Sequence, residues 1–253
     1  MVYSVYFSPT GTSKKGAETI AKVFSPDFKA IDITKFDSMP KDMSFKKDDL
    51  VVFGAPVYSG RIYKGASERL KKFKGDSTIC IISVTYGNRA FDDALIELSD
   101  IVSENGFIPV AGAALVAQHT YGEIQVGRPD DNDVKEDTDF AEKVKSKIEN
   151  GKTEKISVPG NRPYIKGDQG GKGGSFRPLT NDNCIQCGLC VDNCPEGAIA
   201  PDCRTISDKC IACFRCIRNC PMGAKYIDTP EYLGFAESFT KKLSKKLENQ
   251  YFI

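Results

Sequence analysis

The chain has 253 residues and a formal net charge of +1, with 40% hydrophobic and 27% charged residues. This balance is ordinary for soluble globular proteins, and the near-neutral charge gives no general attraction to nucleic acid or to an anionic membrane. The N-terminal residues lack the pattern of a signal peptide, and no apolar stretch is long enough to span a bilayer. We therefore expect a cytoplasmic protein with reduced cysteines and without nucleic-acid binding or an integral membrane segment.

Residues 1–150 alternate apolar runs with amphipathic runs. The apolar runs predict buried strands at residues 2–7, 29–33, 50–54, 78–84 and 107–117. Apolar side chains at helical spacing predict helices at residues 13–24, 64–73, 91–104 and 135–149. Because parallel strands need long return connections, this alternation predicts a three-layer α/β domain with a parallel sheet.

A hydroxyl-rich loop joins the first predicted strand to the first helix. It consists of Ser8, Pro9, Thr10, Gly11, Thr12 and Ser13. Backbone N–H groups at a helix N-terminus form an anion site, and the hydroxyls add donors. The loop lacks the Gly-Lys-Ser/Thr ending of a Walker A motif and the glycines of a dinucleotide site. It therefore favours a terminal phosphate monoester; the alternative is a plain helix cap.

Further loops follow the third, fourth and fifth predicted strands. They are GAPVYSGR (54–61), VTYGNRAF (84–91) and the segment with His119, the only histidine. Ligands of open parallel sheets bind outside the carboxyl ends of the strands, at the switch point between the first and third strands. We therefore expect these loops to share one site. His119 is a candidate proton donor or substrate contact there, with an ordinary loop histidine as the alternative.

The alternation stops at residues 151–180, where residues 158–179 contain six glycines and three prolines. This composition predicts a linker or an irregular strap over the first domain.

An internal repeat follows this linker. NCIQCGLCVDNCPEGAI (183–199) returns as KCIACFRCIRNCPMGAK (209–225). Each half is Cys-x2-Cys-x2-Cys-x3-Cys-Pro, the run that binds 4Fe–4S clusters in bacterial ferredoxins, where the fourth cysteine ligates the other cluster. Zinc knuckles and disulfides are the alternatives, and neither requires this crossing. The predicted ligands are Cys184, Cys187, Cys190 and Cys220 for cluster 1, and Cys210, Cys213, Cys216 and Cys194 for cluster 2.

The remaining cysteines and the end of the chain carry weaker signals. Cys80 lies in an apolar strand and is expected in the core, whereas Cys203 is either a spare thiol or a neighbour of a cluster. Residues 229–253 predict an amphipathic helix with one apolar stripe: Tyr232, Phe235, Ala236, Phe239, Leu243 and Leu247. We expect this stripe to pack on the protein's own domains; a membrane surface or a partner is the alternative.

Together these segments resemble the flavodoxin–ferredoxin fusion proteins of anaerobic bacteria and archaea. The matching motifs are SPTGTSK, TYGNRAFDDAL, GRPDDND (127–133), PGNRPY and the doubled cysteine run. The resemblance implies a flavodoxin-like FMN-binding domain at 1–150, with a doubly wound five-stranded parallel sheet in the order 2-1-3-4-5. It further implies a linker at 151–180, a small α+β two-cluster ferredoxin domain at 181–228 and a C-terminal helix at 229–253.

The similarity to flavodoxins also implies contacts with FMN. Those to the phosphate are Ser8, Thr10, Gly11, Thr12 and Ser13. Those to the isoalloxazine ring are Pro56, Val57, Tyr58, Ser59, Gly60, Arg61, Thr85, Tyr86, Gly87 and Asn88. Tyr58, Tyr86 or Phe91 would stack on the ring, although ordinary packing is the alternative for Tyr86 and Phe91. Tyr86 and His119 are the candidate catalytic residues.

The combination favours an electron-transfer protein that passes low-potential electrons between external redox proteins, its two clusters and FMN. One alternative is an FMN-dependent reductase of a small organic acceptor, with the clusters as the electron inlet. Another is a redox- or oxygen-responsive binding module. The donor, the acceptor, the midpoint potentials and the oligomeric state, a homodimer included, stay open.

Overall fold

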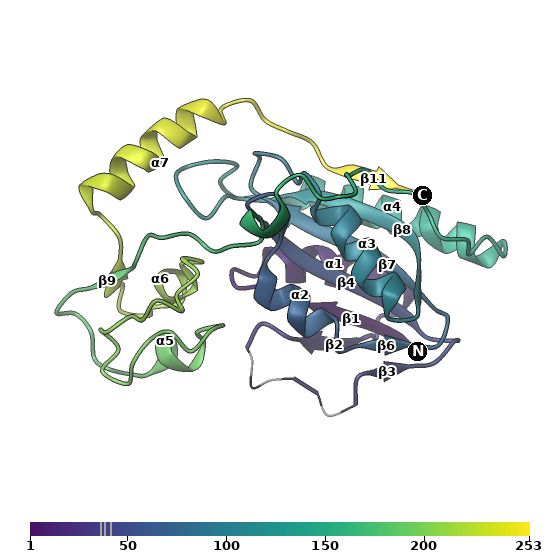
Figure 1. Ribbon diagram of the computed structural model, residues 1–253, viewed down its shortest axis with the longest axis horizontal. Helices are drawn as coiled ribbons and strands as arrows, with labels where there is room; N and C mark the ends of the chain where they lie inside the picture. The colour runs from purple at the N-terminus through teal and green to yellow at the C-terminus, as the bar shows by residue number, and fades with distance from the viewer. Residues whose placement is uncertain (36, 38, 41) are drawn as a thin grey trace.

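The computed structural model describes residues 1–253 except residues 36, 38 and 41. A mostly parallel sheet forms the centre of its N-terminal part (Figure 1). The parallel strands lie in the order β2 (Lys29–Asp32), β1 (Val2–Tyr6), β4 (Leu50–Tyr58), β7 (Thr78–Tyr86) and β8 (Phe107–Val116). The central strands are nearly continuous apolar runs because both faces of the sheet are covered. The α/β class predicted from the sequence is confirmed.

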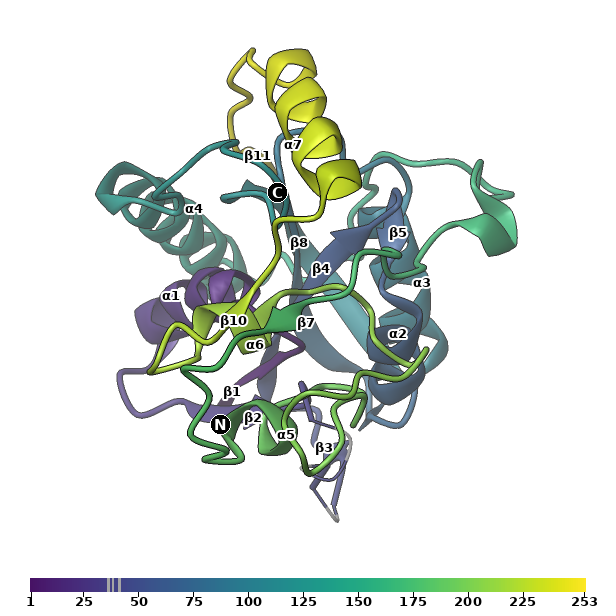
Figure 2. The same ribbon diagram turned by 90° about the vertical axis from the view of Figure 1, so that its left-hand side faces the viewer.

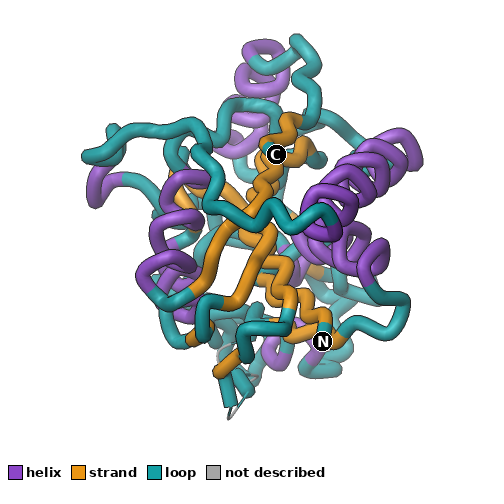
Figure 3. Tube along the Cα trace, turned by 90° about the vertical axis from the view of Figure 1, so that its right-hand side faces the viewer, coloured by secondary structure: helices purple, strands orange, loops and turns teal. Residues whose placement is uncertain are grey.

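Helices cover the two faces of this sheet, as Figure 3 shows. On one face, α1 (Thr12–Phe24) and α4 (Asp131–Glu149) enclose a core with Ile20, Ile81 and Phe140. On the other face, α2 (Lys64–Leu70) and α3 (Ala94–Glu104) enclose a core with Phe53 and Leu95. Short strands lie at the margins: β3 (Ser44–Phe45) pairs with β6 (Lys74–Gly75), and β5 (Arg61–Ile62) pairs with β4. No helix in the described part of the chain is long and apolar enough to cross a bilayer.

The C-terminal segment differs from the helix predicted over 229–253. The helix α7 (Pro230–Lys242) ends early, and β11 (Gln250–Phe252) adds an antiparallel strand to the free edge of β8. Alternate side chains of β11 reach the two cores, Tyr251 on one face and Phe252 on the other. The predicted five-stranded parallel sheet is thus extended, because an uncovered edge of β8 would leave its backbone groups unpaired.

The cysteine-rich part lies at the carboxyl ends of the parallel strands, as Figure 2 shows. It contains the antiparallel pair of β9 (Leu179–Thr180) and β10 (Lys225–Tyr226) and, between them in the chain, the short helices α5 (Leu189–Asp192) and α6 (Arg215–Arg218). An irregular segment connects α4 to β9 and contains a 3-10 turn at Gly167–Gln169. This segment runs along the first domain before it reaches the cysteine-rich part (Figure 1). Gly173 allows this segment to pack closely on the backbone of Ile211, because a Cβ at position 173 would lie only 2.6 Å from the Ile211 Cα.

Candidate cofactor sites

The loop between β1 and α1 presents hydroxyl groups at the carboxyl edge of the sheet. Gly11 caps α1 with a φ of 86°, a conformation that favours glycine. The Ser8 hydroxyl accepts a hydrogen bond from the backbone N–H of Lys14 at 2.9 Å, which closes the loop onto the first turn of the helix. The Thr10 and Thr12 hydroxyls lie 3.5 Å apart. This turn therefore has the donors that an anion site needs.

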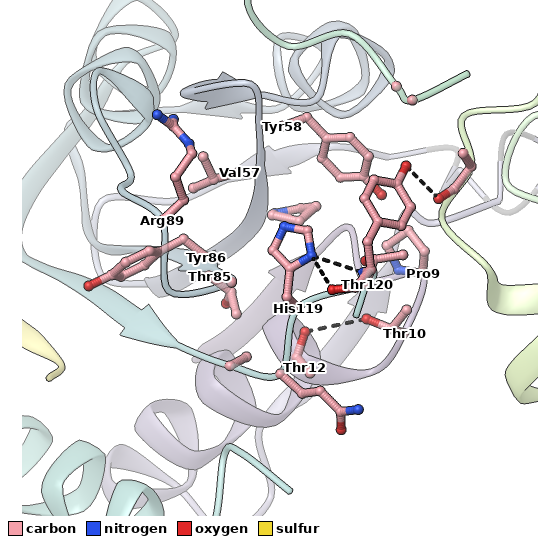
Figure 4. Close-up of a pocket in the computed structure, with 18 of the residues that line it drawn as sticks. Pro9, Thr10, Thr12, Val57, Tyr58, Thr85, Tyr86, Arg89, His119 and Thr120 are labelled. Atoms are coloured by element: carbon pink, nitrogen blue, oxygen red, sulfur yellow. Dashed lines mark hydrogen bonds between the residues drawn. The ribbon is translucent and has the colours of Figure 1, made fainter. Parts of the chain in front are cut away.

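A cavity of about 260 Å³, which we call the carboxyl-edge cavity, brings the predicted loops together (Figure 4). Its lining includes these residues of the predicted site: Ser8, Thr10, Thr12, Ser13, Pro56, Val57, Tyr58, Ser59, Thr85, Tyr86, Gly87 and His119. Two residues of the predicted C-terminal stripe, Phe235 and Phe239, also line it. Other lining residues were not expected at this site: Arg89, Gln118, Thr120, Tyr121, Lys172, Gly173, Gly174 and Ala212. The structure thus collects segments from both domains and from the C-terminal helix around one space.

Buried hydroxyls indicate a polar occupant for this cavity. The hydroxyls of Ser13 and Thr85 are buried and have no hydrogen-bond partner among the described residues. A buried polar group without a partner costs free energy, so a ligand that offers oxygen or nitrogen atoms to these hydroxyls would stabilise the site. FMN fits this requirement, since both its phosphate and its ring edges are polar.

Some residues expected at FMN lie outside the lining of the cavity. They are Gly11, Gly60, Arg61, Asn88 and Phe91. Arg61 instead forms a bidentate ion pair with Glu97, at 2.7 and 2.9 Å, and its guanidinium lies 3.9 Å from the centre of the Tyr164 ring. Asn88 donates to the carbonyls of Leu243 and Lys245. Arg61 therefore holds the segment around Tyr164 in place, and Asn88 holds residues 243–245 in place.

The candidate stacking residues differ in their surroundings. Phe91 packs edge-on against Tyr86, with ring centres 5.5 Å apart, and only Tyr86 of this pair lines the cavity. Tyr58 also lines it, and burial raises the Tyr58 pKa well above its usual value, with the charge of Cys213 adding to the rise. Tyr58 therefore lies between the carboxyl-edge cavity and a cysteine of the second repeat.

His119 lies in the lining of the cavity in an apolar environment. Burial lowers its pKa to about 4, so the ring is neutral at neutral pH. Its Nδ1 lies 2.9 Å from the backbone nitrogen and 3.1 Å from the carbonyl oxygen of Tyr121. The Phe239 ring packs edge-on at 5.0 Å. The ring is therefore held in the lining of the cavity as a neutral imidazole rather than as a cation.

An aromatic cluster closes the cavity between the two domains. Its centre is Tyr121, whose ring lies 5.5 Å from Phe176 and 5.2 Å from Phe214, and whose hydroxyl donates to the carbonyl of Ala212 at 3.1 Å. Phe235 of α7 contacts both Tyr121 and Phe176. The apolar stripe of α7 therefore packs on the protein's own domains. That stripe was the sequence signal for α7, whereas nothing in the pattern marked Tyr121 or Phe176.

The cysteines of the repeat line two further cavities. The first cysteine cavity is lined by Cys184, Cys187, Cys190 and Cys220, together with Cys203. The second cysteine cavity is lined by Cys194, Cys210, Cys213 and Cys216. Within the described residues, no three His, Cys, Asp or Glu side chains converge closely enough for a single metal ion. The two sets of four cysteines around these cavities are the crossed sets that the repeat predicts.

Backbone N–H groups point at the sulfurs in both halves of the repeat. Ala198 donates to the sulfur of Cys194 and Ala224 to that of Cys220, each at 3.2 Å. Gly197 and Gly223, with φ of 56° and 58°, turn the chain back so that these N–H groups face the cysteines. Such hydrogen bonds stabilise thiolates and tune iron–sulfur clusters.

The carboxyl-edge cavity and the second cysteine cavity share a wall. Ala212 lines the first, and its neighbours Ile211 and Cys213 line the second. Arg215, also at the second cysteine cavity, donates to the carbonyls of Ser8 and Pro9 at 3.2 and 2.9 Å. In the described part of the chain, no lining residue of the first cysteine cavity is a direct chain neighbour of a lining residue of the carboxyl-edge cavity.

Family models match three segments of the chain. Residues 4–85 match the family model of the flavodoxin domain, and residues 179–200 and 207–223 each match a model of the 4Fe-4S binding domain. The chain matches no curated protein.

Among solved structures, a flavodoxin from the domain Archaea is 22% identical, with 57% of this chain and 98% of that chain covered and a TM-score of 0.37. Oxidised flavodoxin 1 from Bacillus cereus is 14% identical, with 57% and 97% covered and a TM-score of 0.40. The Streptococcus pneumoniae flavodoxin is 14% identical, with 58% and 98% covered and a TM-score of 0.41.

Proposed function

Because this chain is a flavodoxin domain followed by two 4Fe-4S binding domains, as in flavodoxin–ferredoxin fusions, we propose that it relays low-potential electrons between an external redox protein and FMN. Flavins exchange one or two electrons and each cluster exchanges one, so the cofactors supply the redox chemistry and the chain supplies their placement. In this proposal electrons pass through cluster 1 and then cluster 2 before they reach FMN. We expect the protein to act in the cytoplasm.

The shared wall at Ala212 supports this order most directly. It separates the carboxyl-edge cavity from the second cysteine cavity by one stretch of backbone, 211–213. Cys187, which lines the first cysteine cavity, is exposed. Cluster 2 is therefore the natural neighbour of FMN, and cluster 1 the natural contact for an outside partner.

Fixed docking of the two domains supports a relay within one chain. Arg69 of α2, with 3% of its surface exposed, donates to the carbonyls of Ile33 and Thr34 in the first domain. The same guanidinium donates to the Pro195 carbonyl at 2.9 Å and pairs with Glu196 at 2.8 Å. Since a tethered and docked donor is always next to its acceptor, transfer inside the chain does not depend on collision.

Cysteine variants test this order. The anaerobic holoprotein is mixed with reduced ferredoxin, and bleaching of the flavin is followed by rapid mixing. Cys213→Ala removes a ligand of cluster 2 and should slow flavin reduction at least tenfold, with FMN still bound at about one per chain. Cys80→Ala, a core position away from all three cavities, is the matched control and should reduce flavin at the normal rate.

Flavin reduction at the control rate in Cys213→Ala, with cluster 2 shown to be absent by iron analysis, would contradict the proposed route. Direct reduction of the flavin by dithionite shows in each variant that the flavodoxin domain is intact. Saturable turnover with a small quinone, independent of any protein partner, would favour the reductase alternative instead.

A further inference from the structure

A lysine side chain is buried beside the cysteines of the repeat. Lys225 of β10 is 3% exposed, and its Nζ has no hydrogen-bond partner among the residues that the structure describes. Lys225 is one of the residues that line the first cysteine cavity. An ammonium group is costly to bury without a compensating negative charge, so such a charge is expected within reach of Nζ.

The charged groups that interact with this ammonium are mainly cysteine sulfurs. Its charge acts on Cys190 and Cys220, which belong to the first set, and on Cys210 and Cys216, which belong to the second. Asp202 also interacts with this charge, but Asp202 is exposed to water and its carboxylate accepts hydrogen bonds from the backbone N–H groups of Arg204 and Thr205. Lys225 therefore lines the first cysteine cavity and is within electrostatic reach of both cysteine sets.

The repeat itself shows that the fold does not require a lysine at this position. Lys225 follows Cys220 by five residues, and in the first half of the repeat Ile199 follows Cys194 by the same interval. Ile199 is also buried and also starts a short antiparallel pairing, with Ile206. An apolar side chain thus occupies the equivalent position in the first half of the repeat. The fold alone therefore does not explain why residue 225 is charged.

We propose that Lys225 raises the reduction potentials of both clusters. A cluster held by four thiolates is negatively charged, and reduction adds one more negative charge. A fixed positive charge nearby stabilises the reduced form, strongly so in a water-poor interior. The inference rests on the two clusters of the proposed function and adds to it a residue that sets how readily they accept an electron.

Potentiometric titration followed by EPR tests this role, with Lys225→Ile copying the residue of the first half. In Lys225→Ile, the midpoint potentials of both clusters should fall. We expect the equilibrium between the oxidised and reduced forms to shift about tenfold toward the oxidised form, which for one electron corresponds to about 59 mV. Lys225→Arg keeps the charge and should keep both potentials near those of the unaltered protein. Lys209→Gln removes an exposed lysine next to Cys210 and should shift them much less, because water screens its charge.

Unchanged potentials of both clusters in Lys225→Ile, at full iron and sulfide content, would overturn the inference while leaving the proposed relay intact. If Lys225→Ile loses iron, Lys225→Met is titrated instead, because it also removes the charge but has a flexible side chain. Absence of clusters from the unaltered protein would instead contradict the proposed function. The FMN potential serves as an internal reference in each titration.

Discussion

Single side chains in the loop after β1 decide what the carboxyl-edge cavity can hold. Thr10 and Thr12 offer hydroxyl groups at its mouth, and the buried Ser13 hydroxyl lacks a partner in the described structure. Among the described residues, no acidic side chain lines the cavity. This combination suits the phosphate of the proposed FMN, because it supplies hydrogen-bond donors without introducing negative charge.

Thr10→Glu should therefore abolish tight FMN binding. A carboxylate at this position would repel the phosphate and remove a donor, so the Kd for FMN should rise at least ~100-fold, equivalent to ~2.7 kcal/mol. Fluorescence titration of the flavin-free protein measures this, and Thr10→Ser, which keeps the hydroxyl, should bind FMN within about threefold of the unaltered protein. Flavin binding of normal affinity in Thr10→Glu would show that the phosphate lies elsewhere.

At the level of elements, Tyr251 connects β11 to α4. The Tyr251 hydroxyl donates to Asp137 at 2.8 Å, and the Tyr251 ring stacks on Phe140 at 4.9 Å. Burial raises the pKa of Asp137 from 3.8 to about 7. The folded protein therefore holds a proton on this carboxyl that the unfolded chain releases above pH 3.8.

This difference gives a pH dependence with a definite sign. The contribution of Asp137 to stability is complete below about pH 4 and is lost as pH rises through about 7. Urea unfolding should show that stability relative to Asp137→Asn falls between pH 5 and pH 7, by at most ~1.4 kcal/mol per pH unit. Parallel pH profiles of the two proteins would contradict a protonated Asp137 in the fold.

Helices and strands can be predicted from the sequence where apolar side chains recur at a regular period. Features that depend on contacts between distant segments of the chain cannot be predicted in this way. Strands and helices of residues 1–150 follow their apolar periods, and the cysteine spacing predicts two crossed sets that the structure brings around two cavities. β11 was missed because three residues are too short to show a strand period and follow a helical stripe. Tyr121 and Lys225 were missed because their environment depends on which loops meet.

On the scale of the whole molecule, the cysteine-rich domain sits on the carboxyl edge of the sheet and helps to close the carboxyl-edge cavity, where we propose that FMN binds. Arg69 and Arg215 connect it to the first domain, and α7 with the 172–174 strap completes the enclosure. The placement brings the three predicted cofactor sites together within a single chain. An electron carrier needs this arrangement more than it needs an open substrate pocket.

Cofactor analysis of protein purified without oxygen tests this account most directly. Two four-iron clusters and one flavin predict about eight iron atoms, about eight acid-labile sulfides and about one FMN, not FAD, released per chain on denaturation. Iron and sulfide well below these values, in protein that still carries its flavin, would contradict a relay through two clusters.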